Sequence, residues 1–478
     1  MKIKFGTSGW RAIIADEFTF DNVKLVTQAI ADYVNAKDAA NTKAREVVVG
    51  YDTRFMSDEY AMLASRVLAA NGIRALCCKR DVPTPVVAYE IIRRGAAGGI
   101  NFTASHNPPE YNGIKFSPAW GGPALPETTA AIEKRCEELM LDRSRIKDIL
   151  WEDGLKIKLI EQIDPRPAYL KRIKELINIQ AIKKAKLKAG VDLLYGTARG
   201  YLDFMLDECG VKQIIIHENR DVLFGGHRPE PDEERLAELK KLIKKGKLNI
   251  GLSCDGDADR FGIVDSNGTF ISPNHVIALV LYHLAENKKW RGVVARSVMT
   301  THLIDALAKH YGIKVEETPV GFKYIGDVMV SNKDAFIVGG EESGGLTIRG
   351  HVPEKDGILA CLLMTELMAM QKSSFTEILK KIEKMVGKYA TTRVNFALTP
   401  ELMNKFREQI KANPPAAIAG IKVKETVTKD GFKFILEDNS WVGMRLSGTE
   451  PVVRLYIEAD SAAKLKKLEE ASKKIITG

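Results

Sequence analysis

The 478-residue chain is 45% hydrophobic and 28% charged, a composition typical of a globular protein, and its length suggests roughly three domains. It contains no run of 18 apolar residues and opens without an apolar signal core, so we expect neither a membrane span nor export. The six scattered cysteines are typical of reduced thiols in a cytoplasmic protein. The net charge of +9 is modest, and the lysine-rich segments lack interleaved aromatic residues, which argues against a nucleic-acid partner.

Strand-like and helix-like patterns alternate from the start of the chain. Apolar runs predict strands, and helical periodicity predicts helices between them. The expected strands are 46–52, 73–78 and 96–102, and the expected helices are 21–36, 57–71 and 84–94. The charged stretch 137–156 is typical of a helix end and a linker. This alternation predicts a parallel or mixed sheet covered by helices on both faces.

The same alternation returns twice further along the chain. A second unit is predicted to contain helices 168–186, 197–209 and 232–245 and strands 187–194, 211–217, 248–253 and 261–265, with a tight hairpin at Asn267-Gly268. A third unit is predicted to contain helices 275–286, 301–311, 324–330 and 356–370 and strands 292–298, 313–317 and 335–338. From about residue 390 the pattern indicates strands with one helix, then a final amphipathic helix at 461–476.

We therefore predict three similar mixed-sheet α/β domains followed by a smaller C-terminal α+β domain. The boundaries we expect are 1–152, 153–268, 269–387 and 388–478. Each of the four units also contains one stretch whose residues are suited to binding or chemistry.

In the first unit, Ser105 follows the predicted strand 96–102. The turn residues Asn107-Pro108-Pro109 end that strand, so Ser105 lies just beyond it, where open α/β sheets place their ligands. A serine at this position could be a nucleophile or carry a phosphoryl group. It could equally be an ordinary turn residue, because serine is common in turns.

In the second unit, three aspartates follow the strand 248–253. In an extended segment Asp255, Asp257 and Asp259 point the same way and can converge on one hard cation. The spacing does not fit a calcium loop, and three carboxylates at a strand end suit Mg²⁺. Arg260 is placed to contact a transferring phosphoryl group. The alternative is a solvent-exposed turn rich in aspartate.

The third and fourth units each contain a glycine-bearing loop. The loop 339–345 combines glycines with acidic and hydroxyl side chains, which suits the hydroxyl groups of a polyol; the alternative is a flexible surface loop. The stretch 445–451 combines a guanidinium, hydroxyls and backbone N–H groups, which suits an anion. It lacks the spacing of a nucleotide P-loop. Together the four stretches are suited to moving a phosphoryl group on a sugar phosphate.

These stretches resemble the loops of the α-D-phosphohexomutase superfamily, and the resemblance covers the whole chain. The similar segments are Phe5-Gly-Thr-Ser-Gly-Trp-Arg11, Thr103-Ala-Ser-His-Asn-Pro108, Asp255-Gly-Asp-Ala-Asp-Arg260, Gly340-Glu-Glu-Ser-Gly344 and Arg445-Leu-Ser-Gly-Thr-Glu-Pro451. The resemblance implies four domains around a central cleft, a phosphorylated Ser105 and one Mg²⁺. It implies that this ion is held by Ser105, Asp255, Asp257 and Asp259.

The resemblance also assigns the substrate contacts. It implies that Glu341 and Ser343 contact sugar hydroxyls, and that Lys323 and Lys355 approach the substrate. The phosphate that does not react is expected to be bound by Arg445, Ser447, Gly448, Thr449 and Arg454.

The implied reaction interconverts hexose 1-phosphate and hexose 6-phosphate. Phospho-Ser105 donates its phosphoryl group to the free hydroxyl of the hexose monophosphate, which forms a hexose 1,6-bisphosphate. This bisphosphate, which is also the activator, turns around in the cleft and returns its other phosphoryl group to Ser105. Lys115 and Arg11 resemble the family's candidate bases, and Lys115 could serve if neighbouring cations lower its pKa. The alternative for Lys115 is a solvated lysine. His106 is expected to hydrogen-bond within the serine loop.

The identity of the sugar is predicted from two further stretches. The stretches 318–324 and 354–357 look like those of phosphoglucomutases, which favours glucose phosphate. Some bacterial phosphomannomutase/phosphoglucomutases have a histidine where Gly345 stands, and the sequence leaves open whether His351 replaces it. Alternatives are phosphomannomutase or dual specificity, then phosphoglucosamine mutase. From other classes, a Mg²⁺-dependent sugar phosphatase and a non-catalytic sugar-phosphate binder remain. The oligomeric state is expected to be a monomer or homodimer.

Overall fold

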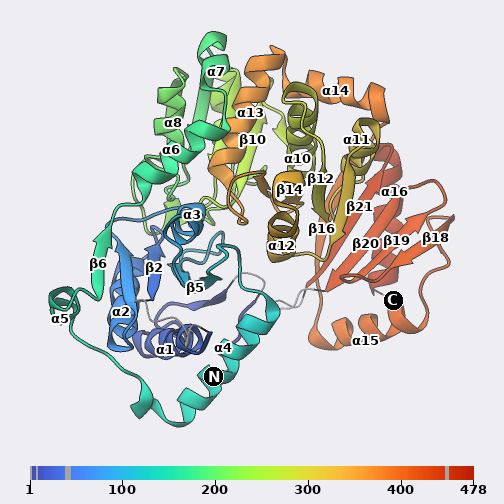
Figure 1. Cartoon of the computed structure of the whole chain (residues 1–478). Coiled ribbons are helices and arrows are strands. Elements are labelled where there is room, and N and C mark those ends of the chain that lie inside the picture. Colours follow the sequence, from blue (N-terminus) through green and yellow to red (C-terminus); the bar gives the residue numbers. More distant parts are fainter. Residues whose placement is uncertain (1–2, 7–8, 38–44, 447–451, 478) are drawn as a thin grey trace.

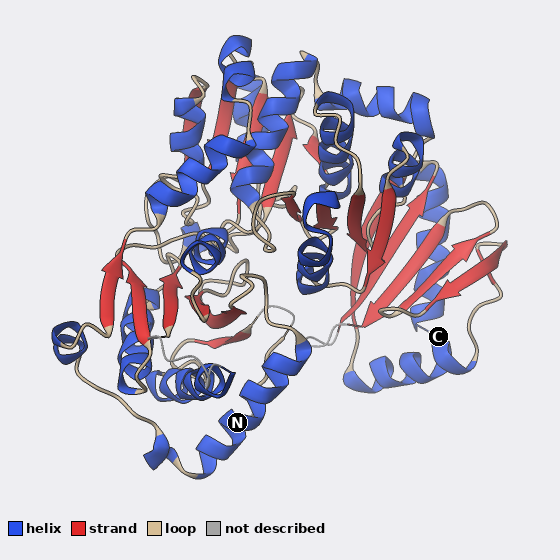
Figure 2. Ribbon diagram, viewed as in Figure 1, coloured by secondary structure: helices blue, strands red, loops and turns tan. Residues whose placement is uncertain are grey.

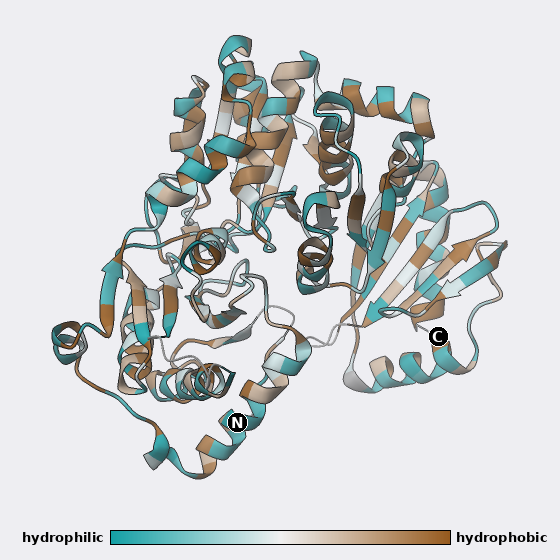
Figure 3. Ribbon diagram, viewed as in Figure 1, coloured by the Kyte–Doolittle hydropathy of each residue, from teal (hydrophilic) through white to brown (hydrophobic). Residues whose placement is uncertain are grey.

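A computed structural model describes residues 3–6, 9–37, 45–399, 401–446 and 452–477, and the backbone of Pro400. Its strands form four sheets, one in each of four units that follow one another in Figure 1. Among the described helices, none combines the length and the apolar character needed to cross a bilayer. The peripheral helices show hydrophilic and hydrophobic stretches side by side in Figure 3, as expected when one face packs on a sheet.

The first unit is a six-stranded mixed sheet. Its order is β1 (Trp10–Ile13), β5 (Tyr111–Pro118), β4 (Gly98–Phe102), β2 (Glu46–Tyr51), β3 (Arg74–Cys78) and β6 (Ile160–Ile163). Its helices are α1 (Phe20–Lys37), α2 (Ser57–Ala70), α3 (Thr84–Arg94) and α4 (Pro126–Leu141). Residues of α1, α2 and α4 share one apolar core, whereas α3 contributes to the core of the second unit. The first and second units are therefore joined through α3.

The first sheet extends beyond the boundary predicted at residue 152. β6 pairs in parallel with β3, with Ala75 opposite Ile160, so it belongs to this sheet although the sequence placed it in the second unit. The stretch predicted as a linker contains the end of α4, a short 3-10 turn (Arg143–Arg145) and α5 (Trp151–Lys156). Four residues carry too little periodicity to be recognised as a strand, and pairing with β3 decides their place.

The second unit is a five-stranded mixed sheet. Its order is β11 (Phe270–Ile271), β10 (Phe261–Asp265), β9 (Ile250–Cys254), β7 (Lys188–Asp192) and β8 (Lys212–Ile216). Its helices are α6 (Arg166–Leu176), α7 (Ile179–Ala185), α8 (Leu202–Glu208) and α9 (Ala237–Gly246). The single helix predicted at 168–186 is two helices, because the Asn178 side chain accepts from the Ala181 N–H and starts α7 anew. The predicted hairpin is present, with Gly268 at a φ of 81°.

The third unit has four strands and is joined to the second by a buried helix. The strand order is β13 (Lys314–Thr318), β12 (Val293–Ser297), β14 (Phe336–Glu341) and β15 (Gly345–Ile348). The helices are α10 (Pro273–Tyr282), α11 (Leu303–Tyr311), α12 (Phe322–Asn332), α13 (Gly357–Gln371) and α14 (Phe375–Val386). Helix α13 contacts β9 and β10 of the second sheet as well as β15 and α10. It lies between the two units in Figure 1.

The fourth unit is an antiparallel sheet with two helices, coloured by element type in Figure 2. Its order is β16 (Ala390–Ala397), β21 (Val452–Ala459), β20 (Trp441–Leu446), β19 (Phe432–Leu436), β18 (Ile421–Val427) and β17 (Ala417–Ile418). Its helices are α15 (Pro400–Ala412) and α16 (Ala462–Thr477). The predicted fold class, three mixed-sheet α/β units and a smaller α+β unit, is confirmed.

Candidate active site

Ser105 meets an aspartate of the second unit. It lies just after β4, is 1% exposed and has a φ of 52°, in the left-handed region. Its backbone N–H donates to Thr103 Oγ1 at 2.8 Å, and its Oγ donates to Asp255 Oδ2 at 2.8 Å. Two loops 150 positions apart in the sequence are therefore in direct contact.

The three aspartates form a buried cluster after β9. Asp255, Asp257 and Asp259 are at most 1% exposed, and one carboxylate oxygen of each lies within 4.8 Å of the others. The alternative of a solvent-exposed turn is therefore wrong. The expected convergence occurs, but through a turn in which Ala258 has a φ of 56°, and not through an extended segment.

Two oxygens of this cluster are available to a cation. Asp257 Oδ1 and Asp259 Oδ1 are buried and have no hydrogen-bond partner in the described part of the chain. Buried unpaired acceptors are costly unless a ligand satisfies them. Hard carboxylate oxygens suit Mg²⁺, so the donor set fits that ion.

Lys115 reaches the same cluster from the first sheet. Its Nζ donates to Asp257 Oδ2 at 2.5 Å and to Asp259 Oδ2 at 2.8 Å. Lys115 is 6% exposed, so the alternative of a solvated lysine is wrong. Burial lowers the pKa of Lys115, but the two carboxylates outweigh it and the pKa is raised. Lys355 and Arg11 also lower the pKa of Lys115, as a base would need, but the two carboxylates outweigh them.

The three carboxyl groups differ in acidity. Burial and the charges of Asp257 and Asp259 raise the pKa of Asp255 well above its usual range. Burial also acts on Asp259, but Lys115 and Lys355 hold the pKa of Asp259 below its usual value. Lys355 Nζ lies 3.2 Å from Asp259 Oδ2. The carboxyl group that faces Ser105 is thus the least acidic of the three.

Three further predicted residues surround the serine loop. Arg11 Nη1 donates to Asn107 Oδ1 at 2.7 Å. His106 Nδ1 lies 3.4 Å from Ser105 Oγ, and burial, with Arg260 and Arg11 nearby, lowers the pKa of His106 well below its usual value. Arg260 donates its backbone N–H to Asp255 Oδ1 at 2.9 Å and its Nη1 to Glu230 Oε1 at 3.1 Å. The serine loop is thus lined by cations and a neutral imidazole.

The predicted polyol loop lies next to the aspartate loop. Ser343 Oγ donates to Glu341 Oε1 at 2.6 Å, and the Phe261 N–H donates to Gly344 O at 3.2 Å. Glu341 is 7% exposed, and burial with the charge of Glu342 raises the pKa of Glu341. The loop is anchored to β10 and its first carboxylate is buried, so it is not a free surface loop.

Models of one protein family match most of the chain. They are described as phosphoglucomutase/phosphomannomutase α/β/α domains I, II and III and the C-terminal domain, and they match residues 2–142, 167–268, 272–385 and 402–474. The chain belongs to the phosphoglucomutase/phosphomannomutase family. It is therefore an enzyme of the mutase class, an isomerase that transfers phosphoryl groups.

Individual relatives agree on this reaction class. A phosphoglucomutase of Komagataeibacter xylinus is 30% identical and covers 100% of this chain and 91% of its own. A phosphoglucomutase/phosphomannomutase of Thermococcus kodakarensis is 29% identical, covering 99% and 98%. A crystal structure from Thermus thermophilus, named a "putative phosphomannomutase", is 32% identical with a TM-score of 0.84 and covers 100% of both chains. These names differ in the sugar.

The residues predicted to bind phosphate lie partly outside the part of the chain that the structure describes. Ser447, Gly448 and Thr449 are among those that the structure does not describe. Arg445, at the end of β20, donates from Nε to Asp430 Oδ1 at 3.0 Å and stands opposite Arg454 of β21.

The predicted lysines of the third unit differ in their contacts. Lys355 Nζ donates to Glu354 Oε1 at 2.8 Å in addition to its contact with the aspartate cluster. Lys323 is half-buried at the start of α12, with Nζ 5.4 Å from the Tyr324 ring centroid, and burial lowers its pKa. Of these two lysines, Lys355 lies in the charge cluster around the aspartates.

His351 is paired with a carboxylate in the protein interior. Its Nε2 lies 2.7 Å from Asp356 Oδ2, which also accepts from the Tyr169 hydroxyl at 2.6 Å. Because Tyr169 belongs to α6, this contact joins the second and third units. The His351 side chain is fully buried in this arrangement.

Two residues that contact the site were missed from the sequence. The Thr84 hydroxyl donates to Asp257 Oδ2, and its backbone N–H donates to Asp257 O at 2.9 Å. Arg54 contacts the serine loop. Both follow strands of the first sheet, β3 and β2, so the rule that ligands lie at carboxyl ends of strands would have indicated them.

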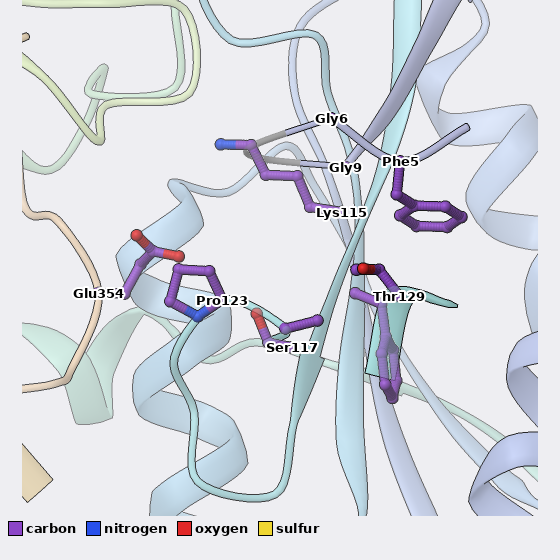
Figure 4. A pocket seen from close by; sticks show the side chains of 10 residues that line it. Phe5, Gly6, Gly9, Lys115, Ser117, Pro123, Thr129 and Glu354 are labelled. Carbon is purple, nitrogen blue, oxygen red and sulfur yellow. The ribbon is translucent and has the colours of Figure 1, made fainter. Parts of the chain in front are cut away.

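A small cavity of about 20 Å³ adjoins Lys115 (Figure 4). Its lining includes Phe5 and Gly9 of the N-terminal loop and Glu354 of the third unit. A space of this size holds about one water molecule. A Cβ atom on Gly9, whose φ is 95°, would lie 2.4 Å from Ile114 O, so the N-terminal loop lies tightly against β5.

Proposed function

We propose that this enzyme interconverts hexose 1-phosphate and hexose 6-phosphate, with glucose phosphate as the preferred substrate. Ser105 carries the phosphoryl group, and hexose 1,6-bisphosphate is the intermediate and activator. The observation that supports this most is the 2.8 Å contact of Ser105 Oγ with Asp255 Oδ2 inside a buried group of three aspartates. A nucleophile next to a candidate Mg²⁺ site is the arrangement that phosphoryl transfer requires.

The residues that would hold Mg²⁺ are Asp255, Asp257 and Asp259, together with the oxygen on Ser105. When bound, the ion would neutralise charge on the phosphoryl group and help to orient it. The unpaired Oδ1 atoms of Asp257 and Asp259 support this assignment.

The remaining residues position and neutralise. Arg11 hydrogen-bonds the Asn107 side chain of the serine loop, and the His106 ring lies next to Ser105 Oγ. Arg260 adds positive charge beside the loop. Lys115, whose Nζ donates to Asp257 and Asp259, adds positive charge beside the aspartate cluster. Phosphoryl transfer depends more on positioning and electrostatics than on covalent chemistry, so such residues contribute directly to rate.

The sugar would bind at Glu341 and Ser343, with the distal phosphate at Arg445 and the neighbouring loop. The buried Glu341 Oε2 has no hydrogen-bond partner among the described residues and would accept from a sugar hydroxyl. Because the bisphosphate must bind in two orientations, the site needs polar groups that accept either end of the sugar. Glucose is preferred in the proposal because the stretches 318–324 and 354–357 resemble those of phosphoglucomutases.

The first experiment tests the carrier. Ser105→Ala is expected to lose mutase activity on glucose 1-phosphate even with glucose 1,6-bisphosphate supplied, measured by coupling glucose 6-phosphate to its dehydrogenase. Ser144→Ala, which alters an exposed serine of the same unit, is the control and should match the wild type. Near-wild-type activity of Ser105→Ala would refute the proposal, as would release of inorganic phosphate at the rate of sugar-phosphate consumption.

The second experiment tests the sugar. The 1-phosphates of glucose, mannose and glucosamine are compared with and without Mg²⁺. We expect the highest kcat/KM with glucose 1-phosphate and loss of activity with EDTA. A higher value for mannose or glucosamine would change the assigned sugar.

A further inference from the structure

Arg54 is a fully buried arginine at the carboxyl end of β2. All five of its N–H donors have acceptors. Nε donates to Asp52 Oδ2 at 3.2 Å, and the other four reach backbone carbonyl oxygens of the serine loop and the residues after it. Those four bonds go to Ser105 O (2.8 Å), Asn107 O (2.6 Å), Pro108 O (2.7 Å) and Tyr111 O (2.9 Å).

This arrangement uses the shape of the guanidinium. A buried cation is costly unless its donors are satisfied, and five donors in a fixed plane can bind several carbonyl groups at once. Lysine has three donors on one nitrogen and cannot reproduce the pattern. Asp52 in turn is fixed by the Arg54 N–H (2.9 Å) and the Ser57 hydroxyl (3.0 Å), so the guanidinium has a rigid support.

The bonded carbonyl groups belong to a backbone that needs support. Ser105 has a φ of 52°, a left-handed conformation that is unfavourable for a residue other than glycine. Its carbonyl also lies against the aspartate loop (255–260), because a Cβ atom on Gly256 would be 2.9 Å from Ser105 O. A shift of the serine backbone would therefore move Oγ away from Asp255 or press the two loops together.

Arg54 also contacts the second unit directly. Its guanidinium carbon lies 5.0 Å from the centroid of the Phe224 ring, within the range of a cation–π contact. The segment that follows Phe224 reaches the aspartate loop, since the Gly256 N–H donates to Pro229 O at 3.2 Å. The Arg54 side chain thus contacts the serine loop on one side. On the other side it contacts Phe224, in the segment that leads to the aspartate loop.

We propose that Arg54 is a positioning residue of the mutase reaction, which holds the serine loop in its left-handed conformation so that Ser105 Oγ meets the aspartate cluster. The inference rests on the proposed role of Ser105. Arg54 acts through four carbonyl groups and does not touch the reacting hydroxyl, so its loss should slow phosphoryl transfer more than it weakens sugar binding.

The test compares Arg54→Lys with Arg66→Lys. Arg66, on α2 of the same unit, also bonds a backbone carbonyl (Ile149 O, 2.8 Å) and a carboxylate, but away from the site. For Arg54→Lys we expect kcat on glucose 1-phosphate to fall about 100-fold, as small misplacements can cause, with KM changed less than about threefold. Phosphorylation of Ser105 by glucose 1,6-bisphosphate, followed by mass spectrometry, should slow in parallel. Arg66→Lys should leave both unchanged.

A structural readout separates positioning from loss of fold. Hydrogen exchange in peptides covering 103–111 should rise in Arg54→Lys while the rest of the first sheet stays protected. An activity loss that only matches the unfolded fraction, or a folded variant with wild-type kcat, would overturn the inference. Should Arg54→Lys fail to fold, Phe224→Leu decides: a several-fold fall in kcat at constant KM supports the inference and an unchanged kcat overturns it. Activity retained by Ser105→Ala would instead refute the carrier, independently of these results.

Discussion

Replacing Lys115 with methionine should destabilise the metal-free protein. Lys115 Nζ lies 2.5 Å from Asp257 Oδ2 and 2.8 Å from Asp259 Oδ2, and its side chain is 7% exposed. Removing one partner of a buried ion pair costs about 3–5 kcal/mol because the other charge stays buried and unpaired. For a unit of roughly 150 residues this corresponds to a fall of about 10 °C in the midpoint of thermal unfolding.

The same geometry predicts how cations and pH modify this loss. In Lys115→Met the carboxylates lose their competing ammonium group, so Mg²⁺ should stabilise the variant more than the wild type. Saturation at a hundred times Kd contributes about 2.7 kcal/mol, and tighter binding contributes more. The loss should also be smaller in acid, because Asp257 and Asp259 can then take up protons and relieve the unpaired charge.

The assay is thermal unfolding in EDTA and in MgCl₂, at two pH values, for the wild type, Lys115→Met and Lys79→Met. Lys79 is an exposed lysine that follows β3 and serves as the matched control. The reasoning is refuted if Lys115→Met unfolds at the same temperature as Lys79→Met in EDTA. It is also refuted if Mg²⁺ raises the midpoint of Lys115→Met by no more than that of the wild type.

Two further variants test other parts of the chain. Lys433 is fully buried, donates to Val298 O at 2.7 Å and lies 2.8 Å from His302 Nε2, and burial lowers its pKa from 10.5 to about 7. Between these two pKa values the unfolded chain binds one more proton than the folded protein, so folding becomes more favourable as pH rises. From about pH 7 to 8.5 the free energy of unfolding of the wild type should increase by about 1.5 kcal/mol relative to Lys433→Met, measured by urea unfolding. A difference that stays constant with pH would contradict this. In Gly357→Ala the new Cβ would lie 2.2 Å from Arg260 O, so we expect a stability loss of about 1–3 kcal/mol and a lower kcat. Wild-type values in both thermal unfolding and the coupled assay would contradict this clash.

The sequence predicted the chemistry of the loops better than their contacts. Residue types and spacing indicated the group of Asp255, Asp257 and Asp259, and the structure brings their oxygens together. The turn that brings these oxygens together has Ala258 in a left-handed conformation, which an alanine in the sequence does not predict. The contact of Lys115 with this group could not be predicted, since it depends on how two separate sheets meet.

Local patterns likewise predicted elements where the periodicity was long enough. α3 was predicted with its observed bounds, and α13 within one residue at each end. β6 was missed because four residues carry little pattern and pairing with β3 determines them. Arg54 was not recognised either. Its side chain makes five hydrogen bonds, and four of them go to backbone carbonyl groups, which every residue type has and which therefore leave no pattern in the sequence.

The contacts between the units fall into two groups. The first three units meet in one buried charge cluster, through Ser105 to Asp255, Lys115 to Asp257 and Lys355 to Asp259. The fourth unit is joined to the third elsewhere: Glu458 of β21, which accepts from the Trp441 indole of its own unit at 2.7 Å, also accepts from the His302 N–H of the third unit at 3.1 Å. Because the proposed reacting groups belong to the first set of contacts, changes at the second should act on the predicted phosphate-binding residues of the fourth unit, such as Arg445. Such changes would alter substrate binding before they alter the geometry around the serine.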